Sequence, residues 1–542
     1  VAKWPEGLEK CDVLNGTLEV TGNTDNIDLS PLKNIRAVKG DVIIESNSQI
    51  SDLSWLSSLK TVEGGVRVST NAQLTDISAL DSLETVTNSL DIWKNDSLTT
   101  LPHFTNLTTL GRLFITGNPT LTKIIGFDAV TSVMEWVKIA DNGAMTEVTG
   151  LSQVPSVVPE GVEIQGKVGS LKVFNGLHDA TSVNVFVEGA NVDSFGALQD
   201  LSGALGFSAL NLQSAGGTFD SLVSVGHFLH VDCQDCVQIP AFASLSTVKV
   251  VDSNWLGLPG IDISLQSSTG ALITTLPPLA SLTEVDGTIK ISASSAGSNT
   301  VQLFPSLKAV WSGDITVQLS DAVATLTGFQ SLQGIDGSLS ISGPALTQVS
   351  GFEALTSVKG MTFEGPLVSV PDFNALVEYG QGGNFAEDTL DYWGQRPVYL
   401  KIWNTNVMHD FGGLTGLEQI QTLDFDNCDN LSTITGLTSL KQVGALYSDD
   451  PFSAEQNHGS LLTGYVSLTD VSGLAQLEAV ENDLQLPVCG GNPMLMGSLT
   501  SVGGDFNVCA DEDHYCASLD WFDGMSKGGG TLSGTPPEGG CL

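Results

Sequence analysis

A repeat with a period close to 24 residues is the feature that most constrains the fold of this chain. Short segments in which two apolar residues flank a variable one, with asparagine three residues later, align without gaps. Successive segments lie 24 residues apart at first and then 23 and 24 residues apart: Leu18/Val20/Asn23, Val42/Ile44/Asn47, Val66/Val68/Asn71, Leu90/Ile92/Asn95, Leu113/Ile115/Asn118 and Val137/Ile139/Asn142. Self-similarity at a fixed period of roughly 20 to 50 residues is typical of solenoids and other repeat architectures.

Each apolar, variable, apolar triplet predicts a short strand with one buried face. The two apolar residues point into the coil, and the residue between them points outward. The asparagine comes where the chain leaves the strand, so its amide can bond backbone groups in the neighbouring coils. We therefore expect a stacked structural ladder made of Asn23, Asn47, Asn71, Asn95, Asn118 and Asn142.

The motif continues with drift through the rest of the chain. Later inward pairs are expected at Val162/Ile164, Val185/Val187, Leu210/Leu212, Leu229/Val231, Ile289/Ile291, Ile315/Val317, Leu339/Ile341, Met361/Phe363, Leu400/Ile402, Leu423/Phe425, Leu484/Leu486 and Phe506/Val508. The pattern predicts an all-β fold, an elongated right-handed parallel β-solenoid of about twenty coils. We divide the chain into a cap (1–17), regular coils (18–165), less regular coils with insertions at 371–398 and 448–465 (166–508), and a cysteine-rich C-terminal cap or tail (509–542).

The opening of the chain resembles a known family. Cys11-Asp-Val-Leu-Asn-Gly-Thr-Leu18-Glu-Val20, followed by Asp28-Leu-Ser-Pro-Leu32 and Ile35-Arg-Ala-Val38-Lys-Gly, closely resembles the start of the L domains of epidermal growth factor and insulin receptors. The resemblance covers residues 11–150. It implies a leucine-rich β-solenoid whose first turn is tied by a cysteine. It does not by itself assign a receptor function, because one fold hosts many functions.

Composition narrows the class of protein and its partners. The chain is 41% hydrophobic and 15% charged, which excludes an intrinsically disordered protein. Its formal net charge of −40 repels phosphate backbones, so we expect no nucleic acid partner. No segment reaches the roughly 18 to 20 apolar residues of a membrane span, so we expect no direct span. The acidity favours solubility, with calcium or a cationic partner as the alternative.

Cysteines and sequons indicate an extracellular, secreted glycoprotein. The even set of cysteines predicts disulfides in an oxidising compartment: Cys11, Cys233, Cys236, Cys428, Cys489, Cys509, Cys516 and Cys541. We expect a Cys233–Cys236 bridge and bridges among the last four, while either Cys11 or Cys428 could bridge to another chain. The four sequons predict glycosylation at Asn15, Asn95, Asn106 and Asn430.

Two patterns could hold a metal. His227, His230, Cys233 and Cys236 follow one another at three-residue intervals, which suits zinc, although an oxidising compartment favours the local disulfide and leaves zinc and redox chemistry as alternatives. The acidic runs at Asp424, Asp426 and Asp429, and at Asp511, Glu512 and Asp513, could collect calcium, because that ion takes several oxygen ligands. Solvated turns at coil corners explain the same acidic residues, so we expect no obligatory cofactor.

The sequence shows no recognised catalytic motif. The outward residues of the first strands form a mixed row without clustered carboxylates: Glu19, Ile43, Arg67, Asp91, Phe114, Lys138, Glu163 and Phe186. The seven histidines accompany no nucleophile elbow or phosphate loop. Trp93, Phe114, Trp136 and Trp403 fit packing against neighbouring coils better than a sugar platform. We therefore expect no enzyme, and keep a carbohydrate-active β-helix enzyme as the weakest alternative.

The sequence favours a structural or adhesive extracellular protein, a cell-surface or matrix rod that could assemble into filaments. The alternative is a ligand-binding, receptor-like ectodomain with protein or glycan partners. In both cases we expect partner contacts on the exposed strand face and on the insertions, since insertions in repeat proteins emerge as loops. The first insertion carries aromatic residues of the kind enriched in contacts: Tyr379, Phe385, Tyr392 and Trp393. The other possibility is that these rings cover the flank of the solenoid.

Overall fold

The protein divides into two compact units in a computed structural model. Unit 1 comprises Val1–Gly257 and Ser264–Ile273, and unit 2 comprises Leu258–Ile263 and Thr274–Leu542. The structure describes residues 5–143, 145–157, 160–189, 191–249, 260–267, 279–293, 298–373, 375–376, 399–403, 407–420, 422–426, 428, 430–443, 461–463, 469–480, 484–485, 498–503, 506–507 and 526–527.

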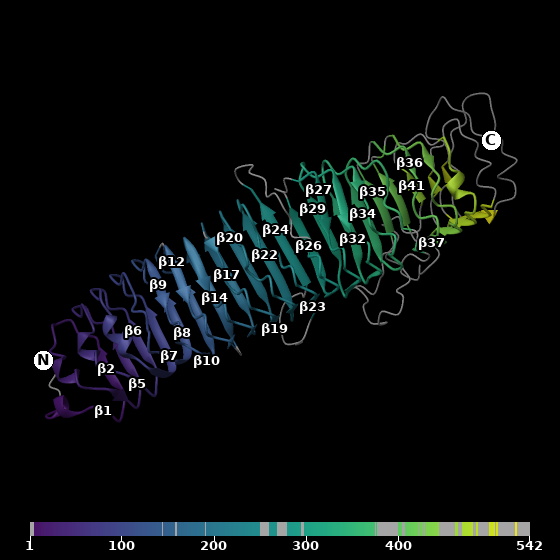
Figure 1. Cartoon of the computed structure of the whole chain (residues 1–542). Helices are drawn as coiled ribbons and strands as arrows, with labels where there is room; N and C mark the ends of the chain where they lie inside the picture. Colours follow the sequence, from purple (N-terminus) through teal and green to yellow (C-terminus); the bar gives the residue numbers. More distant parts are fainter. Residues whose placement is uncertain are drawn as a thin grey trace. The chain divides into compact units, whose positions relative to one another are not determined.

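Unit 1 is built on parallel strands, one from each coil, which we call its main sheet (Figure 1). These strands are β2 (Leu18–Thr21), β4 (Val42–Glu45), β6 (Val66–Ser69), β7 (Thr85–Trp93), β8 (Thr109–Thr116), β11 (Trp136–Ala140), β14 (Gly161–Lys167), β17 (Val183–Glu188), β20 (Leu205–Leu210) and β22 (Phe228–Gln234). Leu18 lies beside Val42, and Val42 beside Val66, so neighbouring strands are one repeat apart. The predicted all-β, parallel solenoid is confirmed.

The core of unit 1 lies inside the coils. Alternate residues of the main-sheet strands are buried, as expected: Leu90 and Ile92 are fully buried, while Glu19 and Arg67 lie on the outward face. Burying one such side chain contributes about 1.5 to 3 kcal/mol. Because every coil repeats the arrangement, the core is a continuous column rather than a single central cluster.

The six asparagines stack along unit 1 and bond one another. Oδ1 of Asn71 accepts from the backbone N of Asn47 (3.0 Å) and from its Nδ2 (3.1 Å). Nδ2 of Asn71 in turn donates to the carbonyl of Ile44 in the preceding strand (2.9 Å). In every neighbouring pair along the row from Asn23 to Asn142, the later asparagine likewise accepts, through its Oδ1, from the backbone N and the Nδ2 of the earlier one. The ladder supplies partners to buried polar groups at a corner that has no regular backbone pairing.

The structure corrects the predicted register of two coils. The sequence predicts that Val162/Ile164 align with Val185/Val187 in the next main-sheet strand and with Leu210/Leu212 in the strand after it. In the structure the aligned pairs are Val183/Val185, two residues earlier in the chain, and Leu205/Phe207, five residues earlier. Ile164 pairs with Val185, and Val185 pairs with Phe207. The main-sheet strands β14, β17, β20 and β22 are six or seven residues long, so they carry a third inward residue such as Ala209. A longer strand offers more than one apolar, variable, apolar triplet, which explains the error at Val185/Val187. Leu210 instead lies on the outward side of its strand, so the triplet Leu210/Leu212 imitates the motif without being an inward pair.

A row of buried phenylalanines marks another corner of the coils. In unit 1 these are Phe104, Phe127, Phe174, Phe195, Phe219 and Phe242, all with positive φ. Phe195 stacks on Phe174 and Phe219 with ring centroids 5.8 and 5.4 Å apart. Each phenylalanine begins a turn in which its carbonyl accepts from the residue three positions on, as in Leu198 N to Phe195 O (3.1 Å). The aromatic stack stabilises a backbone conformation that bulky residues rarely adopt.

The first coils turn this corner differently. Short 3-10 helices, η2 (Ser30–Leu32), η3 (Ser54–Leu56) and η4 (Ser78–Ser82), replace the phenylalanine turn. In each, an aspartate two residues earlier accepts from the first backbone N of the helix, as Asp52 does from Ser54 (2.9 Å). Side strands complete the unit: β9 (Lys123–Gly126), β12 (Glu147–Gly150), β15 (Ser170–Val173) and β18 (Asn191–Val192) in one sheet, and β13 (Ser156–Val157), β16 (Asp179–Ala180), β19 (Asp200–Leu201), β21 (Ser224–Val225) and β23 (Thr247–Val248) in another.

Unit 2 repeats this plan with its own parallel main-sheet strands. These are β26 (Thr288–Ala293), β29 (Ile315–Leu319), β32 (Ser338–Ser342), β34 (Gly360–Glu364), β35 (Tyr399–Trp403), β38 (Thr422–Asp426), β41 (Leu461–Thr463), β43 (Leu484–Gln485) and β45 (Phe506–Asn507). Met361 lies beside Leu400, so the two strands pair directly although 371–398 lies between them in sequence. A second row of phenylalanines runs through Phe304, Phe329 and Phe352. Among the described residues of either unit, no helix is long and apolar enough to cross a membrane.

Candidate functional site

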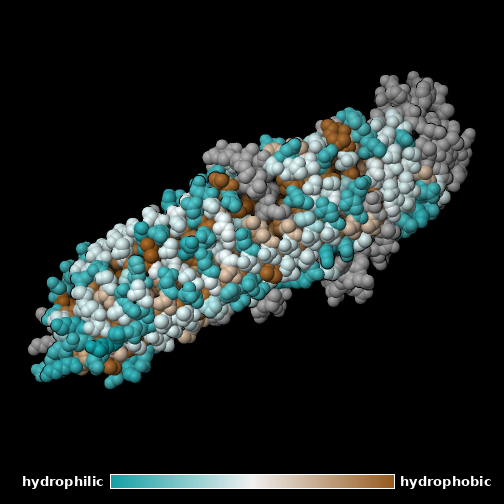
Figure 2. Space-filling model, viewed as in Figure 1, coloured by the Kyte–Doolittle hydropathy of each residue, from teal (hydrophilic) through white to brown (hydrophobic). Residues whose placement is uncertain are grey.

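The outward face of β6, β7, β8 and β11 gathers charged and aromatic side chains. Strand alternation points Arg67, Asp91, Arg112, Phe114 and Trp136 away from the core. We call these five residues the Arg112 patch. Figure 2 shows that the visible surface is mostly hydrophilic or neutral, with hydrophobic residues in small separate areas. A compact mixed patch is therefore a more plausible contact site than a broad apolar face.

An ion pair lies at the centre of the patch. Nη2 of Arg112 lies 3.0 Å from Oδ2 of Asp91, and its Nε lies 3.3 Å from Oδ1, so the contact is bidentate. The hydroxyl of Ser89 also donates to Oδ2 (3.0 Å). The hydrogen bond to Asp91 raises the pKa of Arg112; partial burial opposes the shift, and the charges of Asp91, Glu135 and Glu160 add to it. Arg112 thus stays a fixed cation.

A β-bulge brings this pair together. The register between β7 and β8 shifts between Val86 and Ser89, and beyond the shift Ser89 lies beside Arg112. Bulges re-aim side chains and are often found beside functional sites. The sequence pattern does not reveal this pair, because Arg112 precedes its apolar triplet and the pattern assigns only the middle residue of each triplet to the outward face. The signal that points to the pair is structural: a charged residue, Arg112, lies on the strand that pairs with the bulged strand β7.

Aromatic rings flank the ion pair. Phe114 and Trp136 meet edge to face with ring centroids 6.3 Å apart. Nζ of Lys138 lies 5.2 Å from the Trp136 ring and 2.9 Å from a carboxylate oxygen of Glu163. On β7, Nζ of Lys94 lies 5.2 Å from the ring of Trp93. Aromatic residues, methionine and arginine are enriched in protein interfaces, and Met134, 50% exposed, adjoins the patch in sequence.

The comparison with protein families decides what the first coils are. Residues 10–124 match the Receptor L domain. The receptor L domain match includes Arg67, Asp91, Arg112 and Phe114 of the Arg112 patch, and ends before Trp136. It also covers all three coils with 3-10 corners and ends soon after Phe104, the first corner phenylalanine. The suspected receptor L domain-like solenoid is confirmed for this segment, and no curated protein matches the chain.

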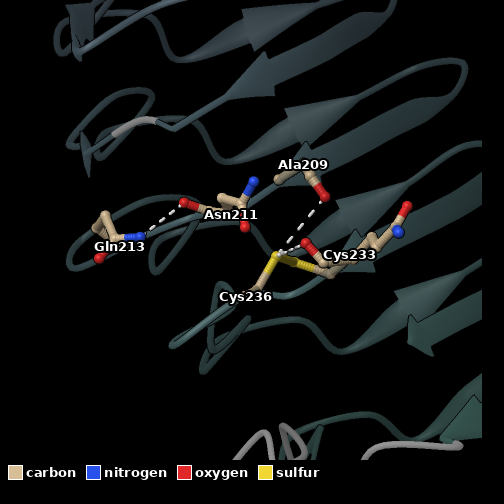
Figure 3. The surroundings of a disulfide bond; sticks show 6 residues. Ala209, Asn211, Gln213, Cys233 and Cys236 are labelled. Atoms are coloured by element: carbon tan, nitrogen blue, oxygen red, sulfur yellow. Dashed lines mark hydrogen bonds between the residues drawn. A yellow bond between two sulfur atoms is a disulfide. The ribbon is translucent and has the colours of Figure 1, made fainter. Parts of the chain in front are cut away.

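The Cys233–Cys236 pair forms a disulfide within β22 and the turn after it (Figure 3). Both residues are buried, and Sγ of Cys236 lies 3.6 Å from the carbonyl of Ala209. Because the disulfide engages both sulfurs, they are not available as zinc thiolates. His227 is buried and His230 is half-buried beside this turn.

Two other cysteines form no disulfide with a described residue. Cys11 forms no disulfide with any described residue, and the first turn is closed instead by backbone bonds such as Cys11 N to Leu8 O (3.0 Å). Cys428 is fully buried, so its sulfur is not open to a second chain. The remaining predicted disulfide cysteines, Cys489, Cys509, Cys516 and Cys541, lie outside the described residues.

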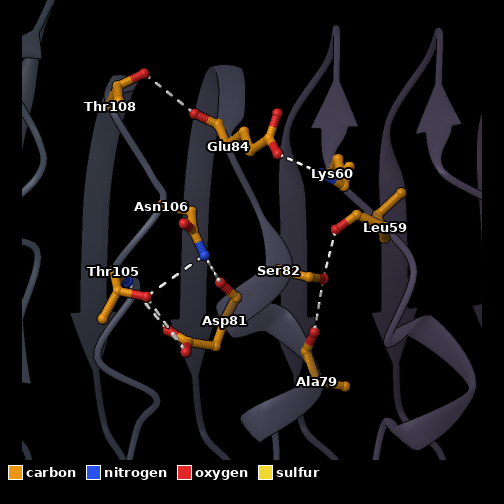
Figure 4. Close-up of polar contacts among 9 residues, drawn as sticks. All are labelled: Leu59, Lys60, Ala79, Asp81, Ser82, Glu84, Thr105, Asn106 and Thr108. Atoms are coloured by element: carbon orange, nitrogen blue, oxygen red, sulfur yellow. Dashed lines mark hydrogen bonds and ion pairs between the residues drawn. The ribbon is translucent and has the colours of Figure 1, made fainter.

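The predicted glycosylation sites fall into two classes. Asn15, Asn106 and Asn430 are exposed. Asn106 stands at a coil corner, where its Nδ2 donates to the carbonyl of Asp81 (3.2 Å; Figure 4). Asn95 is fully buried in the ladder, and its Nδ2 donates to Val68 O (3.0 Å) and to Asn118 Oδ1 (3.3 Å). Burial and these bonds make Asn95 the least accessible of the four sequons in the folded chain, and glycosylation at all four stays a prediction.

The remaining candidates are only partly described. Asp424 lies 3.4 Å from Nζ of Lys401, and Asp426 belongs to the same strand, β38. Asp429, Asp511 and Asp513 lie outside the described residues, as do the aromatic candidates Tyr379, Phe385, Tyr392 and Trp393. No group of three or more His, Cys, Asp or Glu residues in the described part of the chain is placed to hold a metal ion. Calcium binding stays a prediction.

Proposed function

We propose that this chain is an extracellular, non-enzymatic protein that binds a partner protein through the Arg112 patch. The receptor L domain family is one of ligand-binding, non-enzymatic domains that are typically extracellular, and the match spans the coils that carry most of the patch. The single observation that carries the proposal is the bidentate Asp91–Arg112 pair beside the aromatic rings of Phe114 and Trp136 on an outward sheet face. Rigid arginine and tryptophan side chains are the usual centres of binding energy in protein contacts.

The net charge of the chain favours a partner protein that is not strongly acidic overall. With a net charge of −40, the chain attracts basic partners and repels strongly acidic ones. The structural or adhesive role, including assembly into filaments, stays a prediction for which the Arg112 patch gives no specific support. The patch could serve that role only if its partner were a second copy of the chain.

The test compares binding by wild-type protein and by the Trp136→Ala and Arg112→Ala variants. Labelled, purified chain is titrated onto intact cells and extracellular matrix of the source organism. We expect saturable binding that falls at least tenfold in affinity, about 1.4 kcal/mol, in both variants. Lys172→Ala is the matched control, because Lys172 pairs with Asp193 (3.2 Å) on side strand β15. Binding that both patch variants retain would contradict the proposal, and sedimentation velocity of the chain alone reports self-association.

A further inference from the structure

Arg112 presents hydrogen-bond donors that no described residue uses. A guanidinium carries several N–H donors in a planar fork. Nε and one Nη2 hydrogen point to the two oxygens of Asp91, and no other described residue accepts from Arg112. The remaining donors lie at the far end of the group, on a side chain that is 42% exposed. The end of the guanidinium, which carries the unused N–H donors of Nη1 and Nη2, is therefore open to a second partner.

Asp91 fixes the direction of that open fork. Its side chain is only 5% exposed, and its oxygens accept from Arg112 and from Ser89. A buried carboxylate with both oxygens bonded has little rotational freedom. The guanidinium above it is therefore held in one orientation before a partner arrives, which lowers the ordering cost of binding. Asp91 acts as a positioning residue.

Arg67 adds a second cation to the patch. It lies beside Asp91 across the β6–β7 pairing, is half-buried, and forms no ion pair with the acidic residues that the structure describes. The charges of Asp91, Glu135 and Glu160 all act on Arg112, so the two arginines do not give the patch a net positive charge. An anionic group would therefore be held by the unused N–H donors of Arg112 rather than by a net positive field.

We infer that the open end of Arg112 binds a single carboxylate, an Asp or Glu side chain of the partner protein, flanked by apolar residues that pack on Phe114 and Trp136. The inference rests on the proposed function and names the chemistry of the same site. Arginine and carboxylate match as planar, bidentate groups, and their hydrogen bonds are among the strong ones. The adjacent rings exclude water from the contact and so strengthen it.

A polyanionic chain fits the patch less well than one carboxylate does. The two neighbouring lysines are already engaged, Lys94 over Trp93 and Lys138 over Trp136 and with Glu163. The face therefore offers no row of open cations to follow a sulfated glycan or a nucleic acid. The overall charge of −40 repels such chains as well.

A displayed library of short random peptides, selected on the immobilised full chain, provides the probe. We expect recovered peptides to share one acidic residue beside apolar ones. Their affinity should fall at least tenfold with Arg112→Ala and about tenfold with Arg112→Lys, which keeps the charge and loses the fork. Replacing the peptide's Glu by Gln should cause a similar loss. Lys172→Ala should bind as the wild type does.

The role of Asp91 has a separate readout. Asp91→Asn should weaken peptide binding in the wild-type background and have no further effect in Arg112→Ala, because Asp91 acts through Arg112. Peptides that lose binding with Trp136→Ala yet contain no acidic residue, and tolerate Arg112→Lys, would overturn this inference while leaving the proposed function in place. Peptides indifferent to every patch variant would overturn both.

Discussion

Sγ of Cys428 lies 3.6 Å from the carbonyl oxygen of Ile402, 26 residues earlier in the chain. Nδ2 of Asn118 stands in the same relation to Ile92, also 26 residues earlier, at 3.1 Å. Both residues follow the second inward residue of their strand by three positions. Leucine-rich repeats place either asparagine or cysteine at this point. Cys428 is therefore a ladder residue of unit 2 rather than a linker to another chain.

This assignment predicts the effect of substitutions at Cys428. Cys428→Asn should change the free energy of unfolding by no more than about 1 kcal/mol, because the amide can donate to the same carbonyl. Cys428→Asp should destabilise by several times more, since it buries a charge. Chemical denaturation measures both. Ready alkylation of Cys428 by a bulky reagent in the native protein would contradict its burial.

The ladder itself predicts a gradient of stability effects. Asn71→Ala removes the acceptor of two Asn47 donors and the donor to Ile44, all at a fully buried corner. Unfolding should become easier by about 3 kcal/mol, because buried polar groups lose their partners. Asn23→Ala is the matched control at the half-buried end of the row, where about 1 kcal/mol is expected. Equal losses at the two positions would show that the ladder does not act as a buried network.

The phenylalanine row predicts a tolerance for leucine. Phe195→Ala leaves a cavity between Phe174 and Phe219 and should lower the free energy of unfolding by about 3 to 5 kcal/mol. Phe195→Leu should cost much less, because Leu151 already occupies the equivalent corner with a φ of 56°. Thermal and denaturant unfolding of both variants gives the comparison. A leucine variant as unstable as the alanine variant would assign the stability to ring stacking itself.

The sequence predicts the coils well where a short motif determines both strand and corner. The period, the inward residues and the asparagine row of the first coils follow from Leu18 to Asn142, because each position has one role that one residue type fills. The longer main-sheet strands of unit 1, β14, β17, β20 and β22, break this rule. Their third inward residue, such as Ala209, makes neighbouring registers equally apolar, and only pairing with β14 decides between them.

The candidate site depends on contacts that periodicity does not encode. Arg112 reaches Asp91 because a bulge shifts the pairing of β7 and β8. The burial of Asp91 also comes from its neighbours, since its strand position is outward. The phenylalanine corners escaped notice for a related reason: their positive φ contradicts the usual preference of a bulky residue and is stabilised by stacking between coils.

The aspartate caps of the 3-10 corners predict a dependence on pH. Hydrogen bonds from Ser54 lower the pKa of Asp52 below its usual 3.8. A lowered folded pKa adds stability above the unfolded pKa, and this contribution is lost as the pH falls through the folded value. The difference in unfolding free energy between wild type and Asp52→Asn should therefore shrink as the pH drops below about 4, since asparagine keeps the acceptor without the charge. A difference that stays constant from neutral to acidic pH would contradict this account.

We expect glycan occupancy to depend on whether the asparagine is exposed, and not only on the presence of the Asn-X-Ser/Thr motif. When the chain is expressed through a eukaryotic secretory pathway, glycopeptide mass spectrometry should find occupancy at exposed Asn15, Asn106 and Asn430 and none at Asn95. Nδ2 of Asn95 is the atom that a glycan would modify, and it is buried and bonded to Val68 and Asn118. Ser97→Ala, which destroys the Asn95 sequon and leaves the ladder intact, should leave the glycan mass unchanged, whereas Thr17→Ala should remove one glycan by destroying the Asn15 sequon. A folded, secreted chain with a glycan on Asn95 would refute the ladder in that coil.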